Sequence, residues 1–197
     1  AKVHINGQSV HPGSAKGKMV SAVLVAMEFQ GMLPVFENPA CTEGHEGFNH
    51  LNSMKGNVEK ADMSYILRDH DSAKLEKKKE TFRKIAAYLN DKYGADTVTV
   101  TITDSYRNMK EQILNHMYIV DAAKEAIEKA GVKVISGPVR GGTDGARLSF
   151  MGLPCPNLGA GSHSAHGKYE YVCVQAMETN IKVLTSIASR ICEIHAK

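Results

Sequence analysis

The sequence predicts an α+β, ferredoxin-like β-α-β-β-α-β domain, followed by part of a doubly wound α/β domain. Stretches that alternate apolar and polar residues, as strands do, are interrupted by two stretches with helical spacing. Their order matches the split β-α-β motif, in which four strands carry both helices on one face. After Asp104 helices and short apolar runs take turns, which is typical of a doubly wound sheet. The expected domains are residues 1–108 and 109–197.

The first strand and helix come from the opening segment. Residues 2–10 alternate like a strand and end in a turn at His11-Pro12-Gly13. A helix is expected to begin at Ser14 or Lys16. Its apolar stripe would consist of Met19, Val20, Val23, Leu24 and Met27.

The rest of this domain reads as a hairpin, a helix and a last strand. Residues 48–56 and 60–68 are extended runs separated near Gly56-Asn57. Asp71-Ser72 can cap a charged helix through about Tyr93. Residues 97–103 are rich in β-branched side chains and predict a strand. The core positions expected in the helix are Leu75, Phe82, Ile85, Ala86 and Leu89.

The second domain is expected to alternate helices with short strands. The predicted helices begin at Asn115 or Asp121 and end at Ala130, begin at Thr143 or Asp144 and end at Met151, and run from about Val172 to His195. The predicted strands are residues 132–135 and 156–158.

Composition limits the classes of function. A net charge of +3 over 197 residues is too small to indicate nucleic acid as a partner. No apolar run is long enough to span a membrane. Four cysteines, none in a C-x-x-C pair, indicate reduced thiols and a cytoplasmic protein. Because Ala1 already lies within a strand-like run, we expect the sequence to be a piece of a longer chain.

The densest chemistry lies between Gly137 and Tyr169. Arg140 is followed by two glycines, a pattern expected where backbone turns sharply or approaches another group closely. A glycine- and serine-rich loop further on holds His163 and His166. Loops that follow strands are where open α/β sheets usually bind ligands.

Several motifs carry a resemblance to a known family. They are His11-Pro12-Gly13, residues 43–48, Met54-Lys55-Gly56, residues 65–69, residues 104–109, residues 140–145, residues 148–158 and His166-Gly167-Lys168. Through these motifs the chain resembles the tripeptide aminopeptidases of the cocatalytic-zinc peptidase family that also contains aminoacylase and carboxypeptidase G. The matching segments cover that family's lid, or dimerisation, domain and the C-terminal part of its catalytic domain.

The resemblance implies a metal-dependent hydrolase that is incomplete in this chain. In the family two zinc ions polarise the scissile carbonyl and lower the pKa of a bound water. Of their ligands, only His166 carries over to this sequence. Because a zinc ion needs about three or four ligands, the chain is not expected to hold zinc or cleave tripeptides without the family's N-terminal catalytic half.

Four other residues carry over with lesser roles. The resemblance implies that His11 reaches into the active site of a homodimer partner and stabilises the oxyanion, as a hydrogen-bond donor can. Arg140 would bind the carboxylate of a tripeptide substrate, for which a bidentate guanidinium is well suited. Arg68 and Asn108 would contact substrate from the lid. The segment before His166, residues 161–165, departs from the family pattern, which leaves the side-chain preference open.

Structural explanations compete with these roles. His11 can be a turn residue, and Arg140 can pair with Asp144. The acidic and histidine clusters at residues 43–46 and 69–71 are interpreted as a loop and a helix cap rather than metal sites. The charged run at residues 74–84 is interpreted as a solvated helix face, and His163 is expected to face solvent. The methionines expected in the core are Met27, Met32, Met54 and Met63.

Two functions remain open at this point. The chain can be part of a tripeptidase whose site forms only with the missing half, or a non-catalytic dimerisation module. Zinc content and tripeptide hydrolysis would favour the first, and a metal-free dimer without activity would favour the second.

Overall fold

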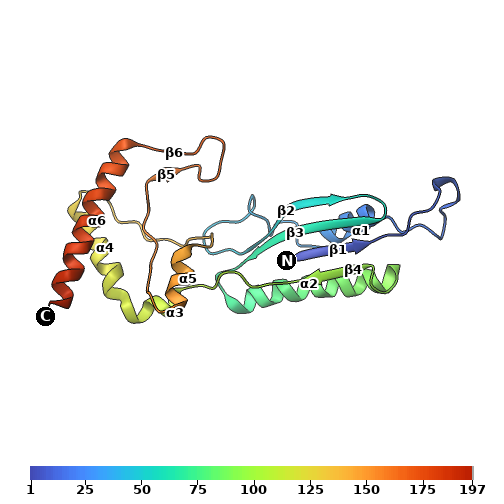
Figure 1. The fold of residues 1–197 in the computed structure, drawn as a ribbon, viewed down its shortest axis with the longest axis horizontal. Coiled ribbons are helices and arrows are strands. Elements are labelled where there is room, and N and C mark those ends of the chain that lie inside the picture. Colours follow the sequence, from blue (N-terminus) through green and yellow to red (C-terminus); the bar gives the residue numbers. More distant parts are fainter. Residues whose placement is uncertain (197) are drawn as a thin grey trace. The chain divides into compact units, whose positions relative to one another are not determined.

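A computed structural model describes residues 1–196 and divides the chain into two compact units, Ala1–Ser105 and Tyr106–Lys197 (Figure 1). The two units are described separately below.

The first unit is built on a four-stranded antiparallel sheet. Its strands are β1 (Lys2–Asn6), β2 (Phe48–Gly56), β3 (Lys60–Arg68) and β4 (Val98–Thr101), in the order β2-β3-β1-β4. The predicted bounds of β2 and β3 are confirmed, whereas β1 and β4 are shorter than predicted. The register of β2 against β3 shifts between Leu51 and Ser53, which marks an irregularity in an edge strand.

Two helices, α1 (Ala22–Gly31) and α2 (Ser72–Tyr93), cover one face of this sheet. Val3 and Ile5 project to the same face of β1 and share one core with side chains from both helices. At the centre, the ring of Tyr65 on β3 lies 4.9 Å from that of Phe82 on α2, and Phe29 on α1 lies 5.5 Å from Phe82. The hydroxyl of Tyr65 donates to Gln30 Oε1 at 2.8 Å, and burial raises its pKa.

The prediction for α1 is wrong in both its start and its buried face. Val20 forms a β-bridge with Gln8, and the backbone amide of Ala22 donates to the carbonyl of Val58, so the chain is still extended at residue 20. With the helix beginning at Ala22, Leu24 and Met27 are 63% and 60% exposed. The face that packs on the sheet consists of Ala22, Val25, Ala26 and Phe29.

The methionine prediction is also mostly wrong. Met63 is buried in the core, as expected, but Met27, Met32 and Met54 are exposed. Met27 is exposed because the helix is rotated relative to the predicted stripe. Met32 lies at the C-terminal cap of α1, and Met54 lies on the edge strand of the sheet.

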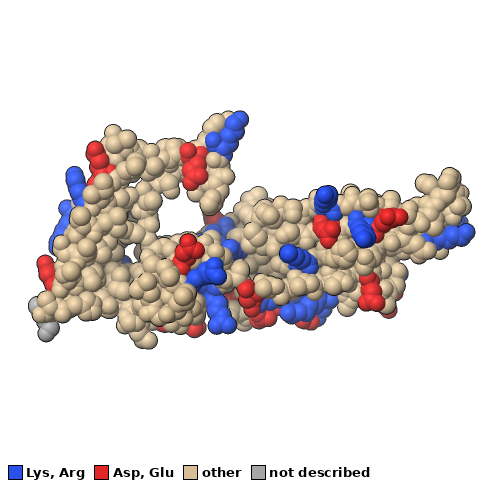
Figure 2. All heavy atoms as spheres, in the orientation of Figure 1, with Lys and Arg blue, Asp and Glu red and all other residues tan. Residues whose placement is uncertain are grey.

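The α2 helix follows the sequence pattern closely. Asp71 caps it, since its Oδ1 accepts from the amide of Lys74 at 2.9 Å. Charged side chains of both signs line the edge where Figure 1 places α2 (Figure 2). The predicted solvated face is wrong at Lys78 and Lys79, which are 9% and 6% exposed. Lys78 pairs with Glu37, and Lys79 bonds Glu76 Oε1 at 2.6 Å and Asp104 Oδ1 at 2.5 Å.

The second unit is mainly helical. It contains α3 (Lys110–Ile113), α4 (Met117–Lys129), α5 (Asp144–Phe150), α6 (Val174–His195) and a short antiparallel hairpin of β5 (Ser162–His163) and β6 (Tyr171–Val172). The three longest helices lie within a few residues of their predicted positions. α4 packs against α6, where Ala122, Ala126 and Val183 are buried. None of the described helices is long and apolar enough to cross a membrane.

The strands predicted at residues 132–135 and 156–158 are not formed. Both segments are without regular secondary structure, so the second unit contains no doubly wound sheet among its described residues. The physical reason is that a strand needs a neighbour to satisfy its backbone groups, and this unit offers these segments none.

Candidate functional site

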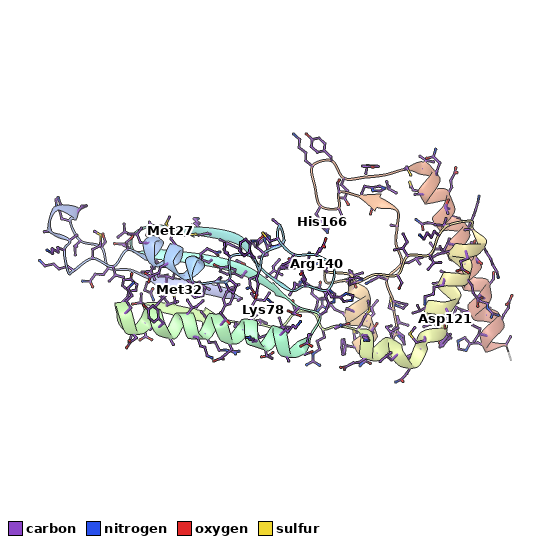
Figure 3. The ribbon with its side chains drawn as sticks, turned by 180° about the vertical axis from the view of Figure 1, so that it is seen from behind. Met27, Met32, Lys78, Asp121, Arg140 and His166 are labelled. Atoms are coloured by element: carbon purple, nitrogen blue, oxygen red, sulfur yellow. The ribbon has the colours of Figure 1, made fainter. Side chains whose placement is uncertain are left out.

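Arg140 lies in the irregular segment between α4 and α5, where one of the two glycines that follow it makes a close contact (Figure 3). A methyl group added to Gly142 would lie 2.5 Å from Cγ and 2.6 Å from Cε2 of Tyr106, which is too close for any side chain. The same addition at Gly141 would meet nothing within 4 Å. A close approach is therefore confirmed at Gly142 but not at Gly141.

Ser149 joins the helix after this loop to the segment beyond it. It is 1% exposed, and its hydroxyl donates to the carbonyl of Gly145 at 2.7 Å and accepts from the amide of Cys155 at 3.0 Å. Gly145 itself lies against the carbonyl of Cys155, 2.6 Å from where a Cβ would be. The hydroxyl thus connects α5 to the segment that follows it.

Asn108 belongs to a segment that contacts the same helix. Arg107 lies over the ring of Phe150 at 5.7 Å, and Met109 Sδ lies 3.8 Å from Ser149 Oγ. The structure therefore brings the segments of Asn108 and Arg140, two predicted substrate-binding residues, into one block. The Oδ1 atom of Asn108 accepts from the amide of Lys110 at 3.0 Å, so this side chain also holds the start of α3.

His166 lies in the loop of the β5–β6 hairpin with a left-handed backbone, at a φ of 64° (Figure 3). Its amide donates to Glu170 Oε2 at 3.1 Å, and the amide of Gly167 donates to the carbonyl of Ser164 at 2.8 Å. These bonds fix the backbone that carries the imidazole. His163, predicted to face solvent, is exposed and stacks on Tyr171 with ring centroids 4.9 Å apart.

The described residues do not fit a zinc site on their own. Among them no group of three or more His, Cys, Asp or Glu side chains could hold a metal ion. The two clusters at residues 43–46 and 69–71 do meet, since the rings of His45 and His70 lie 5.1 Å apart. A zinc ion held through His166 would need most of its ligands from outside this set of residues.

His11 and Arg68, the predicted site residues of the first unit, are not brought together. The Nδ1 atom of His11 accepts from the amide of Gly13 at 3.1 Å, which supports a structural role in the turn. His11 follows the end of β1, where Asn6 pairs with Lys60, whereas Arg68 is the last residue of β3 (Figure 1). The length of β3 alone separates these ends by roughly 26 Å.

Tyr106 and Ser149 organise the block around Arg140, and neither was predicted from the sequence to do so. The glycine at position 142 was a signal that some group packs against this turn, but nothing in the sequence indicated which. The pairing of Ser149 with Cys155 depends on a loop path that periodicity does not describe.

Comparisons with known proteins show what this arrangement is similar to. Residues 1–97 match the model of the peptidase dimerisation domain. Peptidase T from Clostridium perfringens is 53% identical over 187 residues, which cover 95% of this chain and 46% of the relative. Peptidase T from Alkaliphilus oremlandii is 47% identical over 196 residues, which cover 100% of this chain and 47% of the relative. The chain therefore spans about half the length of the curated relatives it matches.

Solved structures show the same fold at lower identity. The aminopeptidase PepT from Bacillus cereus superimposes with a TM-score of 0.75 at 19% identity, over 97% of this chain and 51% of that one. A hydantoinase/carbamoylase family amidase from Burkholderia vietnamiensis gives 0.70 at 17% identity, over 97% and 47%. Such a likeness shows that the fold is shared.

Proposed function

We propose that this chain is the dimerisation and substrate-binding part of a tripeptide aminopeptidase, because it is similar to peptidase T over 95% of its length and its residues 1–97 match the peptidase dimerisation domain. The observation that carries the proposal is the 53% identity with a peptidase T. The proposed reaction is hydrolysis of the N-terminal residue of tripeptides, which this chain does not perform alone. The four cysteines, all free, support a cytoplasmic location.

In this proposal residues 1–108 are the ferredoxin-like lid and residues 109–197 are the C-terminal part of the catalytic domain. The strand order β2-β3-β1-β4, with both helices on one face, supports the first assignment. The exposed apolar residues of the second unit support the assignment of residues 109–197, because the proposed N-terminal catalytic half would cover them.

Substrate binding is assigned to the block that holds Arg140 and Asn108. Arg140 would bind the C-terminal carboxylate of the tripeptide through two parallel N–H···O bonds. Asn108 and Arg68 would contact the rest of the substrate. Zinc, if the enzyme uses it, would be held mainly by side chains outside this chain, with His166 as a single ligand.

A second copy of the chain is the partner proposed for the first unit. α1 contacts β1 and β3, whereas α2 contacts β3 and β4, so α1 lies toward the free edge at β2. Exposed apolar side chains of α1 and of the turn after it form the surface proposed for this contact, and Figure 3 labels two of them, Met27 and Met32. The exposed residues that form this α1 surface are Leu24, Met27, Met32, Val35 and Phe36.

The opposite positions of His11 and Arg68 agree with such a dimer. If each active site uses both side chains, one protomer cannot supply them to the same site across a sheet of this length. A two-fold partner can supply the missing one, since an isologous interface exchanges equivalent elements. His11 would then act as the oxyanion donor in the partner's site.

The proposed function can be tested by combining this chain with the unmatched part of C. perfringens peptidase T. We expect the combination to hydrolyse trialanine and to retain zinc, and the chain alone to do neither. Arg140→Lys should raise KM about tenfold with little change in kcat, because Lys cannot form the bidentate contact. Hydrolysis and stoichiometric zinc in the purified chain alone would contradict the proposal.

A mixed-dimer experiment tests the role of His11. His11→Ala and Arg140→Gln chains should each be nearly inactive in the combination. Together they should recover about one quarter of the unmodified activity, because half of a random mixture is mixed dimers with one intact site each. No recovery would place His11 in its own protomer's site or outside catalysis.

The alternative is a non-catalytic dimerisation module, which the family of residues 1–97 favours. It predicts a metal-free dimer and no hydrolysis with any complementing part. Light scattering separates the dimer question from the catalytic one. Leu24→Glu with Met27→Glu should give a lower mass, while Tyr88→Glu, a matched change of an exposed apolar residue on α2, should not.

A further inference from the structure

We propose that Tyr106 is a positioning residue for Arg140, because its ring packs on the backbone of Gly142 and fixes the turn from which the guanidinium projects. This inference rests on the proposed function, since it assigns Tyr106 to the carboxylate-binding part of that same site.

The contact is selective within the turn. The ring of Tyr106 occupies the space that a side chain at Gly142 would need, with Cγ and Cε2 2.5 and 2.6 Å from the position of a Cβ. Gly141 has nothing within 4 Å of the same position. Only the second glycine therefore lets an aromatic ring reach the backbone, two residues after Arg140.

Tyr106 is itself held by its neighbours in sequence. Arg107 lies over the ring of Phe150 at 5.7 Å, and Met109 reaches Ser149, which is almost completely buried, at 3.8 Å. Both partners are on α5, so the position of the tyrosine ring follows from the position of that helix. The irregular segment before α5 then takes its own position from the ring.

The consequence concerns binding rather than chemistry. A bidentate guanidinium–carboxylate contact depends on the direction of its hydrogen bonds. A displacement of about 1 Å can therefore lower kcat/KM for the substrate by a large factor. Loss of the ring should therefore weaken recognition of the free carboxylate and leave the bond-breaking step unchanged.

The effect on binding can be separated from the effect on the bond-breaking step by kinetics of this chain combined with the unmatched part of C. perfringens peptidase T. Tyr106→Ala should raise KM for trialanine about tenfold, leave kcat near its original value and leave the KM for trialanine amide, which lacks the carboxylate, unchanged. Tyr106→Phe, which keeps the ring against Gly142, should keep the KM for trialanine well below that of Tyr106→Ala. Gly142→Ala should resemble Tyr106→Ala, and Gly141→Ala should be the matched control without effect. Equal changes for both substrates, or a fall in kcat alone, would overturn the proposal.

A second measurement uses the chain alone and needs no activity. Because the α-protons of Gly142 lie against an aromatic ring, their NMR signals should be displaced by the ring current. The displacement should vanish in Tyr106→Ala and persist in Tyr106→Phe and Gly141→Ala. Undisplaced Gly142 signals in the unmodified chain would overturn the contact itself. An inactive combination with displaced Gly142 signals would instead overturn the proposed function, and with it the substrate role of Tyr106.

Discussion

At the scale of single residues, Ser149 shows how one hydroxyl organises a segment without regular structure. It is both donor and acceptor in a position that water does not reach. Removing one partner from such a pair leaves the other buried and unsatisfied, which is the expensive part of losing a hydrogen bond.

We expect Ser149→Ala to lower the free energy of local unfolding of α5 and the Cys155 segment by about 1–3 kcal/mol. Native-state hydrogen exchange at the amides of residues 145–155 measures this directly. Ser189→Ala is the matched control, since that exposed hydroxyl only donates back to the carbonyl of Thr185. Equal exchange in the two variants would show that the Ser149 bonds are not stabilising.

The His4–Asp62 pair gives the first unit a pH dependence of known sign. Nδ1 of His4 lies 2.7 Å from Asp62 Oδ1, and this hydrogen bond, aided by Asn6, raises the pKa of His4. A raised pKa means that the folded state favours the protonated form. The contribution is therefore complete below the ordinary value of 6.5 and is lost as pH rises through the folded value.

Urea unfolding at several pH values checks this sign. Asp62→Asn should lower the unfolding midpoint relative to the unmodified chain below about pH 6, and the difference should shrink by about pH 8. Because His4 is well exposed, the effect should be small. Asp91→Asn, which removes an exposed acid on α2, should show no such trend. A difference that grows with pH would contradict the assignment.

Candidate residues could be predicted from the sequence only as far as local signals reach. The glycine at 142 predicted a sharp turn or a close approach, and the structure shows a close approach. The identity of the approaching ring could not be predicted, because Tyr106 lies 36 positions earlier with no periodic relation to it. The roles of His11, Arg68, Asn108, Arg140 and His166 stay predictions, since they came from family resemblance rather than from geometry.

At the scale of elements, β2, β3 and α2 were predictable because strong periodicity and a capping residue agree. α1 was not, although its residues are more apolar. Its apolar side chains surround the helix, so no single face is indicated by the pattern, and the bridge between Gln8 and Val20 determines where the helix can begin.

The buried lysines of α2 were missed for a similar reason. Their partners lie outside the helix: Lys78 bonds Glu37, which also accepts from Asn49 Nδ2 at 3.3 Å, in the loop before β2. Lys78→Met keeps the length of the apolar stem and removes the charge. It should destabilise the first unit by about 1–3 kcal/mol, less than a fully buried pair because Glu37 is partly exposed.

Urea unfolding gives the size of the Lys78 effect, and hydrogen exchange at Asn49, whose amide donates to the carbonyl of Glu37 at 2.7 Å, gives its location. Lys77→Met on the exposed side of α2 is the control. If both variants have the same stability, the pair does not hold the loop to the helix.

At the scale of the whole molecule, two observations in the second unit agree with each other: the strands predicted at residues 132–135 and 156–158 are not formed, and α6 has a second apolar face. α6 buries one face on α4, while Val174, Met177, Ile181 and Leu184 are exposed roughly 100–180° around the helix from the buried Val183. A helix with two apolar faces belongs between two layers. Both observations agree with the proposal that a separate catalytic half supplies the neighbouring layer.

The α6 face should therefore make the chain associate with itself when no complementing part is present. Ile181→Glu with Leu184→Glu should lower the mass measured by light scattering and should prevent the combination with the unmatched part of C. perfringens peptidase T. Gln175→Glu, on the polar side of the same helix, should change neither. A mass unaffected by the double change would place the association elsewhere.

The irregularity between Leu51 and Ser53 lies in β2, the edge strand at which two copies of the first unit would meet in the proposed dimer. A kinked edge accepts a new strand over a short stretch and then diverges from it. In the proposed two-fold dimer the two β2 edges would cover each other, so neither would remain as a template for a third chain. For a proposed dimerisation domain, such a closed contact favours a pair over an open-ended fibre.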